Sequence, residues 1–200
     1  MEFIELAKNA KFAGLEIASS TTDLRNRALL NIADEIEINK EKIFKANKSD
    51  LDAAKKLVDD GTISHQTFNR LKLDENKMRD MIQGIRDVAS LPDPINKTLL
   101  KCELDDGLIL TKVSCPIGVL GIVFEARPDV ISQISALAIK SANAVILKGG
   151  KESINTNKAI FEVINEAVDK TEGFPKNVLT QIFTHEDVAE MLKCDKYIKP

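Results

Sequence analysis

The C-terminal part of this sequence alternates short apolar runs with amphipathic runs, and that alternation restricts the possible folds most. Apolar runs of strand length occupy residues 118–124, 144–148 and 178–183. Helix-like segments separate them, over residues 130–142 and about 153–170. Strands and helices that alternate at this spacing form right-handed βαβ units. The sequence therefore predicts a doubly wound α/β fold, a parallel Rossmann-like sheet with helices on both faces.

The same alternation extends to the end of the sequence. Residues 185–193 predict a short helix, and residues 196–198 predict the start of a fourth strand. Lys199 and Pro200 follow, and proline cannot donate to a central ladder. We therefore expect an incomplete sheet over residues 116–200, with an exposed edge and marginal solubility in isolation.

The first 96 residues show a helical sequence pattern instead. Apolar residues recur at three- and four-residue steps from Leu24 to Phe44, which predicts one amphipathic helix with Asp23 as its N-cap. Gly61 interrupts the helical pattern, and residues 71–88 resume it. The sequence LPDP at 91–94 then ends helix formation, because proline lacks an N–H and restricts the residue before it.

Residues 97–115 predict a β-hairpin. Two strand-like runs flank Asp105, Asp106 and Gly107, a favourable turn sequence. The chain thus divides into a helical region at 1–96, a hairpin at 97–115 and a Rossmann-like core at 116–200.

Composition excludes several classes of protein. The net charge of -3 gives no electrostatic footprint for nucleic acid, and no apolar run reaches the roughly 20 residues of a membrane span. The N-terminus lacks the features of a signal peptide, so we expect a cytoplasmic protein. Three cysteines without CxxC spacing and two distant histidines argue against a disulfide framework or a metal site.

Two loops follow the carboxyl ends of the first two predicted strands, where open α/β sheets bind ligands. The second loop contains Lys148, Gly149, Gly150 and Lys151 and leads into a helix. Its glycines allow close approach, and free N–H groups with the helix dipole favour an anion. A solvated turn with two lysines explains the pattern about equally well.

The first loop places Arg127 at the end of a strand. Arginine forks onto carboxylate and phosphate oxygens. An ion pair that merely pins the loop is the somewhat favoured alternative. Nothing basic is placed to activate the thiol of Cys102 or Cys115, and Cys194 follows Lys193 on the predicted short helix. We expect all three to be inert small hydrophobic residues, so we assign no nucleophile.

The stretch PIGVLGIVFEARPDVISQISALAIKSANAVILKGGKES is very similar to the γ-glutamyl phosphate reductase family. Members carry PxGVxGxxxExRPxx and, after one helix, KSGNAxxLxGGxE. The similarity continues through EGFPKNVLTQIF and EMLKCDKYI and covers essentially the whole chain. It implies an aldehyde-dehydrogenase-like fold with a nucleotide-binding domain, a catalytic domain and a β-hairpin oligomerisation element.

The resemblance also implies a reaction, the reduction of γ-glutamyl phosphate by NADPH to glutamate 5-semialdehyde and phosphate, in proline synthesis. By position, Lys148 matches the lysine that holds the adenosine ribose, Gly149 and Gly150 belong to the same cofactor loop, and Lys151 would favour the 2′-phosphate of NADP. Arg127 falls where aldehyde dehydrogenases have an oxyanion-hole asparagine, so we expect it to contact the acyl phosphate or the developing oxyanion. Glutamate 5-kinase is a possible partner, and the full-length protein is expected to be a homo-oligomer.

Two departures from the family pattern stand out. Ala142 replaces the usual turn glycine, so we expect Asn143 to supply the left-handed conformation. The family pattern also continues past residue 200 into a catalytic domain with its cysteine. We therefore expect a chain cut off before that domain, with the cofactor-binding half alone and no turnover.

Two other functions stay open. The chain could be a non-catalytic protein that binds NADPH or pairs with a reductase subunit through residues 98–114. It could also be an aldehyde dehydrogenase for another substrate, although the ExRP sequence around Arg127 argues against this.

Overall fold

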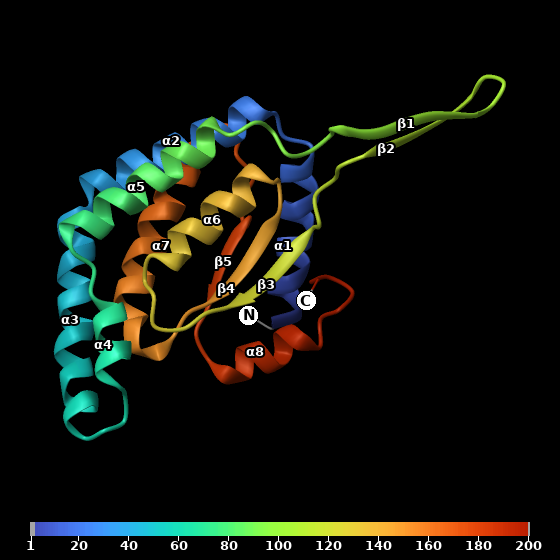
Figure 1. Cartoon of the computed structure of the whole chain (residues 1–200). Helices are drawn as coiled ribbons and strands as arrows, with labels where there is room; N and C mark the ends of the chain where they lie inside the picture. Colours follow the sequence, from blue (N-terminus) through green and yellow to red (C-terminus); the bar gives the residue numbers. More distant parts are fainter. Residues whose placement is uncertain (1–2, 200) are drawn as a thin grey trace.

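The computed structural model describes residues 3–199, which form an α/β fold with a projecting hairpin (Figure 1). Along the chain the elements are α1 (Phe3–Ala18), α2 (Thr22–Ile38), α3 (Lys40–Asp59), α4 (His65–Leu71), α5 (Glu75–Ser90), β1 (Thr98–Asp105), β2 (Leu108–Val113), β3 (Val119–Val123), α6 (Val130–Lys140), β4 (Ala144–Lys148), the 3-10 turn η1 (Lys151–Ser153), α7 (Ile154–Asp169), β5 (Leu179–Ile182) and α8 (His185–Leu192).

The core sheet is parallel, with the strand order β3-β4-β5. Helix α6 connects β3 to β4 and α7 connects β4 to β5, as the alternating sequence predicted. Every residue of the central strand β4 is buried. A strand covered on both faces reads as a continuous apolar run, which explains the sequence AVILK.

Helices cover both faces of this sheet, as predicted. Val145 and Leu147 of β4 belong to a core shared with α2, α5, α6 and α7. Ala144 and Ile146 face the other way, into a smaller core with α1 and α8. Figure 1 shows the two groups of helices on opposite sides of the strands. The alternation of side chains along β4 thus assigns each helix to a face.

The fourth strand predicted at 196–198 is wrong in position. Tyr197 N and Ile198 N both donate to Cys194 O over 2.9 Å, which closes a turn after α8. The chain reaches the sheet only at Lys199, which pairs in parallel with Leu120 of β3. The chain first adds β4 and β5 on one side of β3 and then returns to pair with the other side of β3, so the order of the strands reverses there. Such a reversal is where α/β sheets bind ligands.

The helix predicted from Leu24 to Phe44 is two helices. Asn39 separates α2 from α3, and its Nδ2 donates to Glu35 O over 2.9 Å. The N-cap is Thr21 rather than the predicted Asp23, since Thr21 Oγ1 accepts from Leu24 N over 3.2 Å. An apolar stripe continues across such a break, so periodicity alone did not reveal it.

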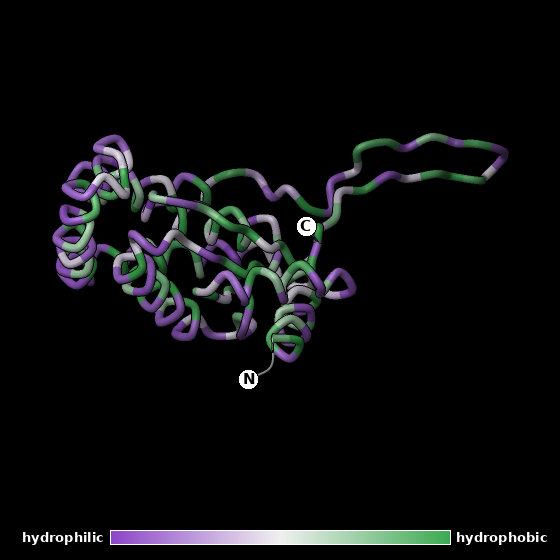
Figure 2. Tube along the Cα trace, turned by 90° about the horizontal axis from the view of Figure 1, so that it is seen from below, coloured by the Kyte–Doolittle hydropathy of each residue, from purple (hydrophilic) through white to green (hydrophobic). Residues whose placement is uncertain are grey.

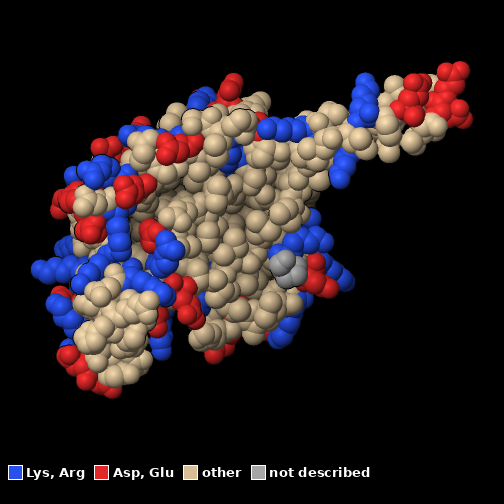
Figure 3. Space-filling view, viewed as in Figure 1, with Lys and Arg blue, Asp and Glu red and all other residues tan. Residues whose placement is uncertain are grey.

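The hairpin of β1 and β2 projects far from the rest of the molecule. Its turn lies where the sequence predicted, with Asp105 paired to Leu108 and Gly107 at a φ of 75°. All of its strand residues except Cys102 are exposed. Many are nevertheless apolar, as the green segments of Figure 2 show. Acidic residues gather at the tip (Figure 3).

The base of the hairpin is anchored by a buried arginine. Arg25 is 1% exposed, and its Nη2 lies 2.5 Å from Asp93 Oδ2 in the segment before β1. Burial raises the pKa of Asp93, but hydrogen bonds from Thr22 and Ile95 N together with the charge of Arg25 outweigh it and lower the pKa below its ordinary value. The carboxylate therefore stays charged, and its segment is held against α2.

The turn between α6 and β4 contains a strained residue that the sequence analysis assigned wrongly. Ala142, with a φ of 54°, adopts the left-handed conformation that was expected of Asn143. Asn143 acts through its side chain instead, because Oδ1 accepts from Gly118 N over 2.9 Å and Nδ2 donates to Ser141 O over 3.1 Å. Moving Asn143 into the left-handed position would break these bonds.

We predict that Ala142→Gly is tolerated far better than Ala144→Gly. Both alanines are fully buried, so each change removes one buried methyl group and makes the unfolded chain more flexible. The two effects together lower the free energy of unfolding by about 1–2 kcal/mol. Only at Ala142 does glycine also relieve a left-handed strain of about 1–2 kcal/mol. Urea denaturation of the two variants measures the difference, and equal losses of stability would contradict this account of the turn.

Candidate functional site

The two loops expected to bind ligands lie side by side at the carboxyl edge of the sheet. β3 and β4 are neighbours, with Val123 paired to Lys148, and Phe124 N donates to Lys148 O over 3.0 Å. A methyl group added to Gly150 would lie only 3.1 Å from Ala126 N. The loop after β4 therefore rests directly on the loop after β3.

Packing against a buried side chain requires a glycine at position 149. A Cβ there would lie 2.2 Å from Asn157 Nδ2, so a larger residue would force the amide away. Asn157 is 1% exposed, and its Nδ2 donates to Ser153 Oγ over 3.0 Å. Its Oδ1 has no hydrogen-bond partner within residues 3–199. The loop thus carries a buried acceptor beside its glycines.

The two lysines of this loop differ in setting. Lys148 ends β4, is 7% exposed and, by strand alternation, lies on the face of Ala144 and Ile146. Lys151 begins η1 and is exposed. Within residues 3–199, neither side chain forms an ion pair. The edge of the sheet therefore carries two positive charges that suit an anionic ligand.

The start of α7 does not offer the free N–H groups that the sequence analysis assumed. Asp50 of α3, 3% exposed, accepts from Asn155 N over 3.2 Å and from Thr156 N over 2.7 Å. It also accepts from Asn155 Nδ2 and Thr156 Oγ1, over 2.8 and 2.6 Å. A carboxylate more than one hundred residues away in sequence already caps this helix. Asn155 N and Thr156 N are therefore not free for a ligand anion, and the anion site expected at residues 148–153 stays a prediction.

Asn47, one helical turn before Asp50, fixes the segment between α4 and α5. Its Nδ2 donates to Leu71 O over 2.8 Å and to Thr156 Oγ1 over 3.2 Å. Its Oδ1 accepts from Leu73 N over 3.0 Å. The same stretch of α3 therefore holds both the start of α7 and the helices that face the loop of Arg127.

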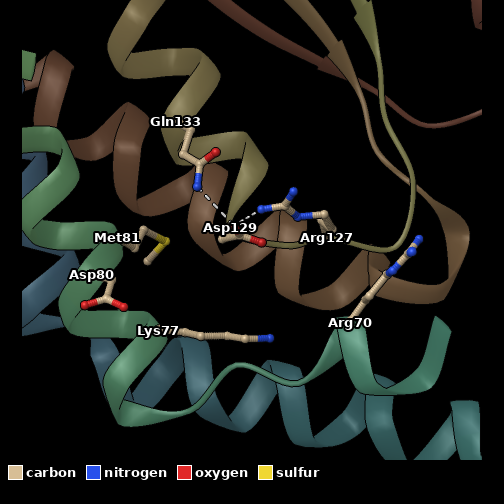
Figure 4. A pocket seen from close by; sticks show the side chains of 7 residues that line it. All are labelled: Arg70, Lys77, Asp80, Met81, Arg127, Asp129 and Gln133. Atoms are coloured by element: carbon tan, nitrogen blue, oxygen red, sulfur yellow. Dashed lines mark hydrogen bonds and ion pairs between the residues drawn. The ribbon is translucent and has the colours of Figure 1, made fainter. Parts of the chain in front are cut away.

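Arg127 is held in place by an ion pair, but its side chain stays exposed. Its Nη2 lies 2.9 Å from Asp129 Oδ2, which also accepts from Gln133 Nε2 over 3.0 Å. The pair matches the alternative in which Arg127 pins its loop. The side chain is nevertheless 54% exposed and lines a cavity of about 350 Å³ (Figure 4). Arg127 can therefore meet a ligand while paired.

The sequence analysis missed the other charged residues of this cavity. Helices α4 and α5 contribute Arg70, Lys77 and Asp80, with Met81 beside them (Figure 4). No local motif marks these residues, since charged side chains on an amphipathic helix are ordinarily solvated. Only the tertiary arrangement brings them to the loop of Arg127.

Cys102 and Cys115 lie away from this edge. Cys102 belongs to the hairpin, and Cys115 precedes β3, at the opposite end of the strand from the loops. Burial, with Glu190 and Asp195 nearby, raises the pKa of the Cys194 thiol, which disfavours the reactive thiolate.

The part of the chain that the structure describes holds no group of three or more His, Cys, Asp or Glu residues arranged to bind a metal ion. None of its helices combines the length and apolar character needed to cross a membrane.

Comparisons with known proteins agree on one family of relatives. The γ-glutamyl phosphate reductases of Brachyspira hyodysenteriae and Pelotomaculum thermopropionicum are 60% and 46% identical over 198 residues, 99% of this chain. This chain is a γ-glutamyl phosphate reductase homologue. It spans about half the length of these relatives, 46% and 44%. No family model matches the sequence.

Solved structures place the γ-glutamyl phosphate reductase homologue in the same group. The enzyme of that name from Saccharomyces cerevisiae superposes with a TM-score of 0.91 at 40% identity, covering 100% of this chain and 50% of that one. The enzyme from Thermotoga maritima gives 0.90 at 30% identity, covering 99% and 47%. Methylmalonate-semialdehyde dehydrogenase from Oceanimonas doudoroffii, at 16% identity and a TM-score of 0.68, shares the fold, which is therefore aldehyde-dehydrogenase-like as expected.

We predict that Asp50→Ala lowers the free energy of unfolding by about 2–4 kcal/mol, because it removes a helix cap and leaves buried N–H groups unpaired. Asp52→Ala is the matched control, since Asp52 is exposed and paired only with Lys55. That change should cost less than about 1 kcal/mol. Chemical denaturation measures both, and similar losses would refute the capping role.

Proposed function

We propose that this chain supplies the NADPH-binding half of a γ-glutamyl phosphate reductase, an oxidoreductase of proline synthesis in the cytoplasm. The reaction reduces γ-glutamyl phosphate to glutamate 5-semialdehyde and releases phosphate. One observation carries the proposal: the loop of Lys148 and the loop of Arg127 touch at the carboxyl edge of the sheet. An anionic cofactor and an anionic substrate bound there would lie next to each other.

The residues after β4 fit a phosphorylated dinucleotide. Gly149 and Gly150 let this loop pack closely against Asn157 and Ala126, and Asn157 Oδ1 has no hydrogen-bond partner within residues 3–199. Lys148 would hold the ribose of the adenosine, and Lys151, exposed at the start of η1, would pair with the 2′-phosphate of NADP. Bound NADPH supplies the hydride for the reduction.

Arg127 would serve the substrate. Its exposed guanidinium is fixed by Asp129 at the mouth of the cavity, so it needs little reordering to meet a phosphate or a developing oxyanion. The ion pair would orient the arginine, and the remaining N–H groups would donate to the ligand.

A second candidate is a non-catalytic protein that binds NADPH or pairs with a reductase subunit. The exposed, apolar hairpin favours a pairing role, because an unpartnered ribbon of this kind buries its surface when it joins another sheet. We assign the same ribbon the homo-oligomer contact in the reductase, with glutamate 5-kinase as a further partner. Binding of NADPH is expected of the first candidate and of the NADPH-binding form of the second.

We predict that Lys148→Ala weakens NADPH binding at least about tenfold, the scale expected for one charge-assisted hydrogen bond. Lys151→Glu should reverse the preference between NADPH and NADH, because the carboxylate repels the 2′-phosphate and accepts from the ribose hydroxyls of NADH. Fluorescence titration of both cofactors measures the two effects.

Lys158→Ala is the matched control for these variants. Lys158 is an exposed lysine of α7, beyond the loop, so its loss should leave both affinities unchanged. If Lys148→Ala and Lys151→Glu bind NADPH as the unmodified chain does, the assignment of the cofactor loop fails.

We also predict that the 200-residue chain alone does not reduce NADP when glutamate 5-semialdehyde and phosphate are supplied. The chemistry needs a thiolate. Cys102 and Cys115 lie away from the two loops, and the raised pKa of Cys194 disfavours its thiolate. Absorbance at the NADPH band detects turnover. If a variant with all three cysteines replaced by serine still formed NADPH, the need for a thiol would also be refuted.

A further inference from the structure

The cavity beside Arg127 has two walls of different origin. The loop between β3 and α6 forms one wall, with Arg127, Asp129 and Gln133. Helices α4 and α5 form the other; Lys77 reaches out from α5 and Arg70 from α4, and Asp80 lies on α5 near Met81 (Figure 4). A volume of about 350 Å³ is within the range of pockets that hold a small metabolite.

The helical wall carries two cations, Arg70 and Lys77, and neither forms an ion pair within residues 3–199. Arg70 forms no ion pair or hydrogen bond there, so its whole guanidinium is free to donate. Lys77 Nζ donates to Lys72 O over 2.5 Å, which fixes its position and leaves further N–H groups for a ligand. Because Arg127 is already paired with Asp129, this wall is a second, separate place for an anion.

The same wall also offers an acceptor and an apolar surface. Asp80 has no hydrogen-bond or ion-pair partner within the described residues, although it lies one turn from Lys77 on α5. Met81, 4% exposed, adds an apolar patch beside it. Lys77, Asp80 and Met81 are three and four residues apart, so they share one face of the helix.

A cation pair, a carboxylate and an apolar patch together are the complement of an α-amino acid with an aliphatic side chain. A carboxylate ligand alone would leave Asp80 facing another negative charge. An aliphatic aldehyde would form no charge-assisted contact with Arg70, Lys77 or Asp80, so these residues would add nothing to its affinity. A zwitterionic end satisfies all three.

We propose that Arg70, Lys77 and Asp80 recognise the α-amino-acid end of the substrate. Arg70 and Lys77 would hold its α-carboxylate, Asp80 its α-ammonium group, and Met81 would contact its methylene groups. Arg127, on the opposite wall, then faces the phosphate end. The inference deepens the proposed function and rests on it, and it makes the two helices specificity-determining for a γ-glutamyl substrate.

The test uses two stable analogues with the 200-residue chain in isothermal titration calorimetry. The first is γ-glutamyl phosphate with a methylene in place of the bridging oxygen. The second has the same phosphonate end but lacks the α-amino and α-carboxylate groups. We expect the chain to prefer the first at least about tenfold, the scale of one charge-assisted contact.

Arg70→Ala, Lys77→Met and Asp80→Asn should each reduce that preference about tenfold or abolish it, while affinity for the shortened analogue stays unchanged. Arg79→Ala is the control, since Arg79 lies on α5 but donates to Asn76 away from the cavity. It should keep the full preference. All of these side chains except Lys77 are exposed, so circular dichroism is expected to show folded variants.

Equal affinity for the two analogues, or no binding of either, would overturn the inference. So would variants that lose both analogues alike, since the helical wall would then attract any anion. NADPH binding is measured on the same samples. If the amino-acid preference is present without NADPH binding, the inference stands and the cofactor assignment fails; if NADPH binds and the preference is absent, the reverse holds.

Discussion

The carboxylate of Asp50 is the contact on which the arrangement of the site depends. It joins α3 to the first turn of α7, and Asn47 on the same helix joins α3 to the segment between α4 and α5. One helix thus sets the distance between the glycine loop after β4 and the helical wall opposite Arg127. Buried hydrogen bonds of this kind are costly to break, so the two halves of the site behave as one rigid unit.

The fold was predictable wherever local patterns decide it. The alternation of apolar and amphipathic runs gave the parallel sheet, and the Asp-Asp-Gly turn gave the hairpin. The errors occurred where individual hydrogen bonds override a pattern. At Asn39, bonds to Glu35 end a helix that an unbroken apolar stripe hides. Near Ala142, the side chain of Asn143 is held by Gly118. The displaced fourth strand has a similar cause, since the turn at Cys194 uses the N–H groups that a strand would need.

The candidate site was predictable only in part. Strand ends can be located from the sequence, so the loops of Arg127 and Lys148 were expected to lie near each other, and the register of β3 and β4 brings them together. The cap on α7 was invisible because Asp50 is far away in sequence. Arg70, Lys77 and Asp80 were missed for the same reason: each sits on a helix whose charged face looks like any solvated surface.

The projecting hairpin makes the segment at its base a pivot. A strand of 8 residues rises roughly 25 Å, so a rotation of 10° at the base would move the tip by about 4 Å. The buried pair of Arg25 and Asp93 lies near that base and joins α2 to the segment that leads into the hairpin. A small change in the packing of α2 is thereby magnified into a large displacement of the acidic tip, which makes the geometry of any assembly built on the ribbon sensitive to a single ion pair.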